Sequence, residues 1–130
     1  MPESPNVGGG PTPTSAPSRI RRWASRRVVV RDKSMLPTLR PGDRLLVDPR
    51  AYRDRPPHVG EVVVFVDPEE PSRWLVKRVS GVDLPSATIE VRGDASETAR
   101  DSRRFGPVPI RSVVGRAYCC YFPADRRREL

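Results

Sequence analysis

Proline and glycine interrupt this chain so often that no long helix fits, and this feature limits the fold more than any other. The chain has 16 prolines among 130 residues, and a proline inside a helix removes a backbone hydrogen bond and clashes with the preceding turn. No window shows a sustained apolar period of 3.6 residues over the length of a helix. We therefore expect a domain with little helix.

Short runs rich in valine, isoleucine, tyrosine and phenylalanine lie between these breaks, and such residues are typical of strands. The runs cover residues 26–32, 43–49, 60–68, 73–81, 87–93 and 113–122. Turn-forming pairs such as Pro56-Pro57 and Gly93-Asp94 separate them. The pattern predicts an all-β (mainly β) domain that is barrel-like or built on a coiled sheet.

The length fits one domain with frayed ends. Residues 1–25 join a Pro/Gly/Ser-rich stretch to a basic one and contain few apolar side chains. Such a segment cannot offset its own ordering entropy, so we expect a disordered tail. The folded domain is expected at residues 26–123, and a loose, charged C-terminal tail at 124–130.

Several features favour a cytoplasmic protein. The longest apolar run, at 62–66, is far shorter than the roughly 18 residues of a membrane span, so we expect no membrane span. The start of the chain does not have the pattern of a secretory signal. Cys119 and Cys120 are adjacent, a poor geometry for a mutual disulfide, which suits a reducing compartment. We expect two small strand side chains there, with a vicinal redox pair as the alternative.

The net charge of +8 raises the question of nucleic acid. Basic residues are scattered among acids through the middle of the chain, and their excess lies at 19–27 and 126–128. The strands also lack the interleaved aromatic residues on which single-stranded bases stack. We expect a solvated basic surface and no nucleic acid partner. A non-catalytic basic β-module that binds nucleic acid remains the alternative outside enzymes.

The single histidine excludes several chemistries. A zinc site needs several His or Cys ligands at defined spacing, and a Ser-His-Asp triad would have to use His58. His58 lies between Pro57 and Val59 in a connecting segment, so we expect an exposed loop residue.

Ser34 lies in "DKSMLPTLRPGDRLLV", where Pro37 and Pro41 exclude a helix. A serine in a loop can be a nucleophile if a base activates it, and lysine can act as that base. The chain has only two lysines, Lys33 and Lys77. Lys33 adjoins Ser34, so in an extended segment its side chain points the other way.

Lys77 lies in "RWLVKRVSG", where strand alternation places it on one face with Leu75 and Val79. A free lysine titrates near ~10.4 and is protonated at neutral pH. Desolvation on an apolar face lowers that pKa and can yield a neutral amine. The alternative is a lysine whose stem covers the core while its head reaches water. The strand pattern leaves both readings open.

Four motifs, in this order, resemble the boxes of the type I signal peptidase family of Ser/Lys endopeptidases. They are "SMLPTLRPGDRLLVD", "VGEVVVF", "VKRVSG" and "GDASETARDSRRFGPVPIRSVVGRA". Together they cover nearly everything from residue 34 to 117. The resemblance implies a coiled, mostly antiparallel β-domain that hydrolyses a peptide bond through an acyl-enzyme, with no metal or organic cofactor.

The same resemblance assigns roles to individual residues. Ser34 matches the nucleophile, and its backbone amide matches an oxyanion-hole donor. Lys77 matches the general base. Asp101, Ser102 and Arg103 match the structural and lysine-supporting positions of the last box. Met35 is expected either to line the pocket for the small residue before the cut or to pack in the core.

Three positions depart from the family pattern. Asp32 stands where many members have Ser or Gly, and an ionised carboxylate there opposes the oxyanion unless it points away. Ala95 stands where Asn is usual. Ala99 stands where a serine often bonds the catalytic lysine, so Ser102 or a water is expected to orient Lys77.

The short form without an anchor, with "VDPRAYRDRPPHVGEVVVF" and "DSRRFGPVP", looks like the soluble branch of nickel-type superoxide dismutase maturation proteases. The expected partner is then a precursor protein that presents an extended N-terminal leader. An anchorless signal peptidase that acts at the membrane on secretory precursors is the alternative, with residues 19–27 as a peripheral contact. A self-cleaving regulator of the LexA type is disfavoured, since the chain has no Ala-Gly or Cys-Gly bond.

Overall fold

The computed structural model describes residues 25–95 and 100–130. They form one eight-stranded sheet in the order β1-β2-β7-β3-β4-β5-β6, and β8 also pairs with β7. Every pairing is antiparallel. The strands are β1 (Arg26–Val29), β2 (Arg44–Asp48), β3 (Val62–Val66), β4 (Trp74–Asp83), β5 (Thr88–Arg92), β6 (Val108–Pro109), β7 (Val113–Phe122) and β8 (Arg128–Glu129). The prediction of an all-β domain is confirmed.

Each of the six expected runs corresponds to one strand, with β4 continuing two residues past its run, but the sequence did not reveal the short elements. These are β6, β8, the one-turn helix α2 (Ser102–Phe105) and the 3-10 turns η1 (Ile110–Ser112) and η2 (Ala124–Arg126). A strand of two residues is too short to show alternation. Helix α2 begins because the Asp101 side chain accepts the Arg103 amide as an N-cap.

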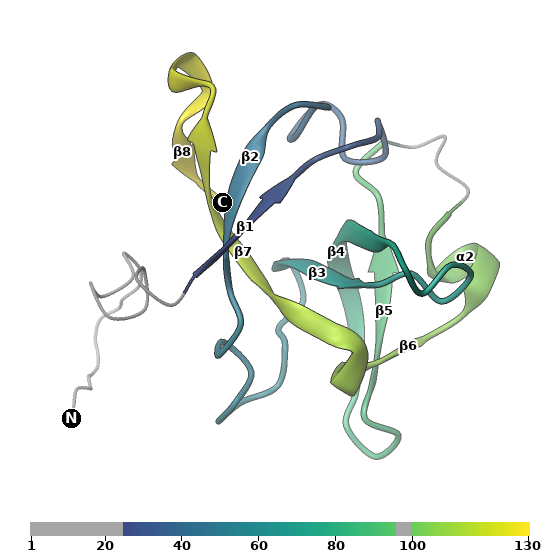
Figure 1. Ribbon diagram of the computed structural model, residues 1–130. Helices are drawn as coiled ribbons and strands as arrows, with labels where there is room; N and C mark the ends of the chain where they lie inside the picture. Colours follow the sequence, from purple (N-terminus) through teal and green to yellow (C-terminus); the bar gives the residue numbers. More distant parts are fainter. Residues whose placement is uncertain (1–24, 96–99) are drawn as a thin grey trace.

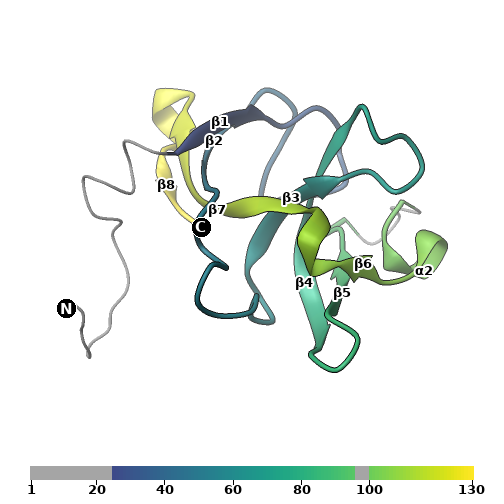
Figure 2. The same ribbon diagram turned by 60° about the horizontal axis from the view of Figure 1, so that its bottom comes forward.

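The sheet coils so that its strands enclose two apolar cores. Figures 1 and 2 show β1, β2 and β8 on one side of the molecule and β4, β5, β6 and α2 on the other, with β3 and β7 between them. Strand β3 serves both cores. Its residues Val62 and Val64 pack in one cluster, and Val63 and Phe65 pack in the other. Both faces of β3 are therefore covered, which explains its uninterrupted apolar sequence.

Strand β4 alternates as its sequence predicts. Leu75, Lys77 and Val79 are buried, while the intervening Val76 packs against the other core. Lys77 lies opposite Val63 of β3 in the register. The apolar face of β4 therefore places a lysine beside the second core.

The expectation of a loose C-terminal tail is wrong. Within residues 124–130, η2 is followed by β8, which pairs with β7, and Leu130 packs against the first core. The Arg126 guanidinium binds both carboxylate oxygens of Asp43 at 2.8 Å. This charged segment is held because its arginine meets a buried carboxylate that lies 83 positions earlier.

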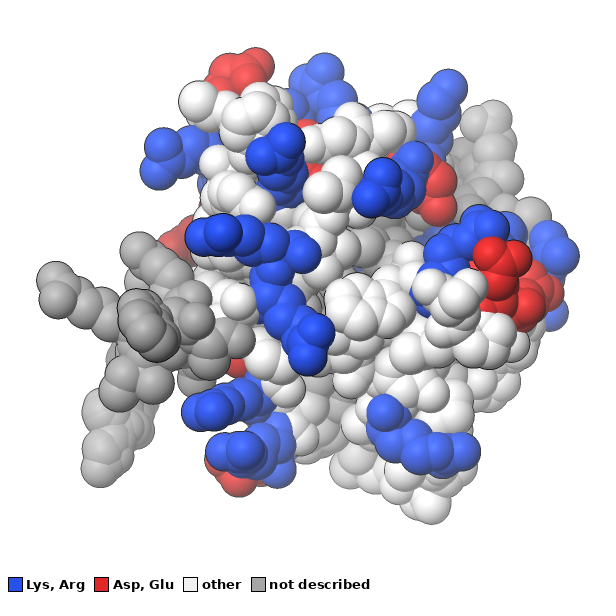
Figure 3. Space-filling model, in the orientation of Figure 1, with Lys and Arg blue, Asp and Glu red and all other residues white. Residues whose placement is uncertain are grey.

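The N-terminal tail expected at residues 1–25 lies outside the described residues except for Ser25. In the part of the chain that is described, no helix is long and apolar enough to cross a membrane. Figure 3 shows lysine and arginine side chains spread over one face, with acidic side chains at a few places among them.

Candidate active site

Ser34 lies in the loop between β1 and β2, which we call the Ser34 loop (residues 31–43). Its base is closed by hydrogen bonds from Val30 to Asp43 and from Gly42 to Val30, 2.8 and 2.9 Å long. Gly42 has a φ of 96°, a conformation that suits glycine. Met35 is 1% exposed and packs in the first core, so Met35 anchors the loop there.

The segment after β5 holds the Ser34 loop from the other side. The Ala95 amide donates to the Ser34 carbonyl at 2.9 Å. Asp94 accepts two hydrogen bonds from the Arg78 guanidinium, at 2.9 and 2.8 Å, and it also bonds the Thr38 side chain. The loop is thus fixed to both β4 and β5.

Ser34 and Lys77 meet at one pocket of about 410 Å³. Its walls are formed by Asp32, Lys33, Ser34, Leu36, Lys77, Ala95 and Arg100. The structure therefore brings together the two residues that the sequence paired as nucleophile and base, although they are far apart in the chain.

The head group of Lys77 is enclosed, not solvated. The residue is 1% exposed, which excludes a side chain that reaches water. Among the described residues, Nζ has no hydrogen-bond partner. Burial lowers the pKa of Lys77 below its usual value, and the nearby Arg100 cation lowers it further. The charges of Asp32, Asp101 and Asp67 act in the opposite direction without reversing the shift. The site thus favours the neutral amine that a base needs.

Asp101, Ser102 and Arg103 directly follow the pocket residue Arg100, but none of the three is among the residues that line the pocket. Asp101 is fully buried; it accepts the amides of Arg103 and Gly93 and binds the Arg103 guanidinium at 2.7 Å. The Ser102 hydroxyl accepts the Val91 amide at 2.8 Å. These contacts join α2 to β5. The charge of Asp101 acts on Lys77 and raises its pKa.

Arg100 is a pocket residue that the sequence reasoning missed. It lies one position before the Asp-Ser-Arg triplet of the last motif. The sequence alone does not distinguish an arginine that lines a pocket there from one on the surface. Its guanidinium binds the fully buried carboxylate of Asp67 and lies 3.5 Å from Glu69. Two carboxylates therefore hold this cation at the pocket wall near Lys77.

The amide of Ser34 is already engaged. It donates to Oδ1 of Asp32 at 3.0 Å, so the carboxylate that departs from the family pattern caps the expected oxyanion donor. The Ser34 side chain remains at the pocket wall, and the residue is 9% exposed.

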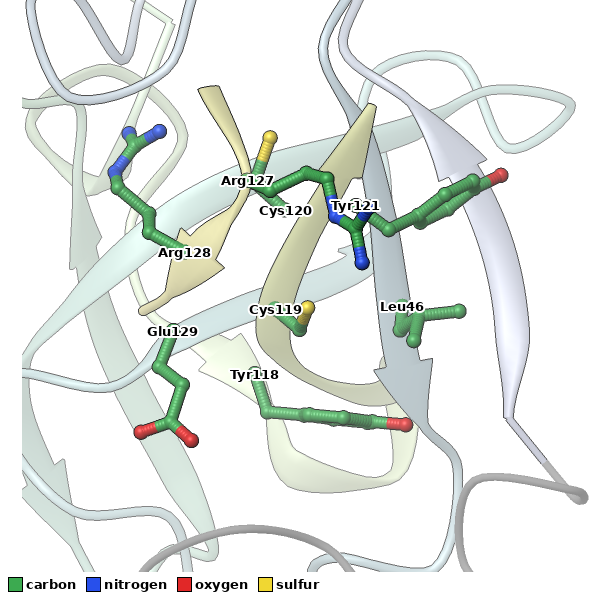
Figure 4. Close-up of a pocket in the computed structure, with 8 residues that line it drawn as sticks. All are labelled: Leu46, Tyr118, Cys119, Cys120, Tyr121, Arg127, Arg128 and Glu129. Carbon is green, nitrogen blue, oxygen red and sulfur yellow. The ribbon is translucent and has the colours of Figure 1, made fainter. Parts of the chain in front are cut away.

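Other candidates lie elsewhere. His58 is exposed in the connection before β3, as expected, and its amide donates to Glu61. Neither Cys119 nor Cys120 takes part in a disulfide within the described residues, and both line a second pocket of about 350 Å³. Figure 4 shows that its walls come from β2, β7 and residues 127–129. This pocket shares no residue with the first. Within residues 25–95 and 100–130, no cluster of His, Cys, Asp or Glu could hold a metal ion.

Comparison with known proteins gives a consistent family. The family model of signal peptidase, peptidase S26, matches residues 18–96. Subunit 1b of the mitochondrial ATP-independent inner membrane protease of Arabidopsis thaliana is 34% identical over 111 residues, which cover 69% of this chain and 66% of that protein. The probable signal peptidase I-1 of Synechocystis is 29% identical, with 75% and 71% covered, and signal peptidase I of Leptolyngbya laminosa is 27% identical, with 85% and 75% covered.

A loop serine and a buried lysine that line the same pocket are the two groups on which a Ser/Lys hydrolase depends. The chain belongs to the signal peptidase family, peptidase S26, a family of serine endopeptidases. The expected family and enzyme class are thereby confirmed.

Proposed function

We propose that this chain is a Ser/Lys endopeptidase in which Ser34 is the nucleophile and Lys77 the general base. The observation that carries the proposal is that both side chains line one pocket while Lys77 is buried without a hydrogen-bond partner among the described residues. A lysine in this environment can take the serine proton at a pH where an exposed lysine cannot.

The reaction follows from these positions. Neutral Lys77 takes the hydroxyl proton of Ser34 as Oγ forms a bond to the scissile carbonyl carbon. The carbon–nitrogen bond then breaks, and the lysine returns its proton to the leaving amine. The first product departs and leaves an ester on Ser34. Lys77 next deprotonates a water that cleaves this ester, so that Ser34 is regenerated.

For the substrate, we propose a precursor protein from which a short N-terminal leader is removed, specifically a nickel superoxide dismutase precursor processed in the cytoplasm. Support comes from the motifs "VDPRAYRDRPPHVGEVVVF" and "DSRRFGPVP", which resemble that branch. An extended leader can add to the edge strand β1, which begins the strand order of the sheet.

A second candidate is a signal peptidase that acts at a membrane surface. Exposed apolar side chains lie beside arginines: Arg26 lies over Trp74 at 5.8 Å, and Arg44 lies over Phe122 at 4.3 Å. Trp74 and Phe122 are 41% and 45% exposed. Aromatic and basic groups of this kind suit the headgroup region of a bilayer. The relative from Arabidopsis is an inner membrane protease by name.

The test is cleavage of a nickel superoxide dismutase precursor, read by intact mass. Wild type should remove one defined leader, whereas Ser34→Ala and Lys77→Ala should not. Ser86→Ala, in the exposed turn before β5, is the matched control and should cleave like wild type. Cleavage by Ser34→Ala would refute the proposed chemistry.

A second arm separates the two substrates. A secretory precursor is offered with and without anionic phospholipid vesicles. Cleavage of that precursor only with vesicles, and loss of vesicle binding in the double variant Trp74→Ala/Phe122→Ala, would favour the membrane enzyme over the soluble one.

A further inference from the structure

The side chain of Asp32 is the hydrogen-bond acceptor of the Ser34 backbone amide. Its Oδ1 accepts this amide at 3.0 Å, and Asp32, Ser34 and Lys77 line the same pocket. One carboxylate thus contacts the expected oxyanion donor and shares a pocket with the expected base.

The contact conflicts with catalysis in the resting arrangement. An oxyanion is stabilised by donors about 2.7–3.1 Å away that point at the developing charge. An amide hydrogen that already points at a carboxylate is not available for a second acceptor. An ionised carboxylate at that distance also repels the new negative charge. The Asp32 side chain must therefore leave before the tetrahedral intermediate forms.

Asp32 is free to leave, unlike comparable carboxylates of this protein. Asp43, Asp67, Asp94 and Asp101 are each held by an arginine. Asp32 is exposed, and in the described part of the chain its carboxylate has no ion pair within 4.0 Å and only the Ser34 amide as a hydrogen-bond donor. A rotation about its side-chain bonds would break that one contact.

Movement of the Asp32 carboxylate away from Ser34 would also change how tightly Lys77 holds its proton. The charges that face Lys77 are Asp32 on the Ser34 loop, Asp101 before α2, Asp67 after β3, and the opposing Arg100. Among the three carboxylates, Asp32 raises the pKa of Lys77 most. Once Asp32 rotates away, Lys77 holds its proton less tightly.

We propose that Asp32 is a positioning residue that caps the Ser34 amide in the resting enzyme, and that the incoming substrate carbonyl displaces it. The displacement frees the oxyanion donor and, in the same step, removes a negative charge that favours protonated Lys77. The inference rests on the proposed Ser/Lys function. It predicts an enzyme that holds its site inactive until a substrate occupies it.

The chain offers an unusually direct test, because Lys33 and Lys77 are its only lysines. Protein labelled with ¹³C at the lysine ε-carbon gives two signals, which Lys33→Arg assigns. The NMR titration of Lys77 is then followed in wild type, Asp32→Asn and Asp32→Ala. We expect a lower pKa for Lys77 in both Asp32 variants. An unchanged titration would overturn the link between Asp32 and the base.

The kinetic arm uses the same proteins and the precursor substrate. Asp32→Ala should raise kcat/KM on the alkaline plateau by roughly 10-fold, since a charge-assisted hydrogen bond no longer has to be broken. Asp32→Asn keeps an acceptor oxygen for the amide and should gain less. In both variants the acid limb of the pH profile should move to lower pH. A plateau below wild type in both variants, at unchanged Tm, would show that Asp32 only shapes the turn and would overturn the proposal.

Asp48 supplies the matched control. It makes the same two-residue contact, accepting the Arg50 amide at 2.9 Å, but it lies outside the set that lines the pocket. Asp48→Asn should change neither the Lys77 titration nor the pH profile. If Asp32→Ala lowers the Tm, the Lys77 titration and the pH profile of Asp32→Asn decide whether the proposal holds. If wild type does not cleave the precursor, the proposed substrate is wrong, and the NMR titration still decides whether Asp32 acts on Lys77.

Discussion

The backbone amide of Ala95 donates a 2.9 Å hydrogen bond to the carbonyl oxygen of Ser34. Through this bond, the segment after β5 positions the loop that carries the expected nucleophile. Ala95 itself offers no polar side chain, so the position of the segment depends on its neighbour Asp94, which binds Arg78 and Thr38.

Asp94→Ala should therefore reduce cleavage more than it reduces stability. Without its carboxylate, the segment can shift relative to Ser34, and a displacement of ~1 Å near a catalytic group can cost about 100-fold in rate. We expect kcat to fall by about 10- to 100-fold, measured on the precursor. The control is Glu70→Ala, which removes the exposed pair with Arg73 and should leave kcat unchanged. Equal losses in both variants would contradict this role of Asp94.

Lys77→Met should abolish cleavage and stabilise the fold. Methionine fills a similar volume without an amine that must be buried. A buried polar group without a partner costs about 1–3 kcal/mol, so the free energy of unfolding should rise by about that amount at pH 7. Because burial lowers the pKa of Lys77, the unfolded chain binds the proton more readily than the folded one. The stability difference between Lys77→Met and wild type should therefore shrink as the pH rises toward ~10.4. A lower Tm for Lys77→Met would argue against a destabilising buried amine at this position.

Cleavage by wild type should increase with pH along an acid limb that reports the deprotonation of Lys77. Since burial lowers that pKa, the limb should lie below the ordinary lysine value of ~10.4. It is measured as kcat/KM against pH. Lys77→Arg should be inactive across the range, because arginine stays protonated. A rate that is independent of pH up to ~10 and requires Lys77 would be inconsistent with its role as the base.

Arg126→Gln should weaken both the fold and the site. Arg126 pairs with the buried Asp43 at the end of the Ser34 loop and also donates to the Thr38 carbonyl. Its loss leaves a buried carboxylate without its partner. We expect a lower Tm in thermal unfolding and a lower kcat. Arg127→Gln changes an exposed neighbour and serves as the control. If the two variants behave alike, the C-terminal segment does not support the loop.

Gly115→Ala should destabilise the sheet, because a Cβ there would lie 2.4 Å from the Asp48 carbonyl oxygen. Gly81→Ala is the contrasting change, since its Cβ would meet only the Glu90 side chain at 3.5 Å. We expect the Tm to fall for the first variant and to stay level or rise for the second. A tolerated alanine at Gly115 would mean that β2 and β7 can separate without cost.

Much of the fold could be predicted because periodicity is local. The alternation in β4 predicted that Leu75, Lys77 and Val79 share a face, and the structure buries all three. The pairing of Ser34 with Lys77 followed from the count of lysines and from the motifs, and the fold places both at one pocket. The C-terminal segment was wrongly expected to be loose, because its charges suggested exposure to solvent. In the structure, Arg126 forms an ion pair with Asp43, which is far away in the sequence.

The sequence by itself determined the strands, the shortage of helix and the residues able to form a Ser/Lys pair, since these depend on residue type and on spacing between neighbours. Only the tertiary structure decided the charges around Lys77. Asp67 lies far in sequence from the adjacent pair Arg100 and Asp101, and the influence of all three on Lys77 depends on distance and burial. It also decided that Asp32 points at the Ser34 amide. A side chain chooses its partner by proximity in three dimensions, and no local pattern of residues carries that information.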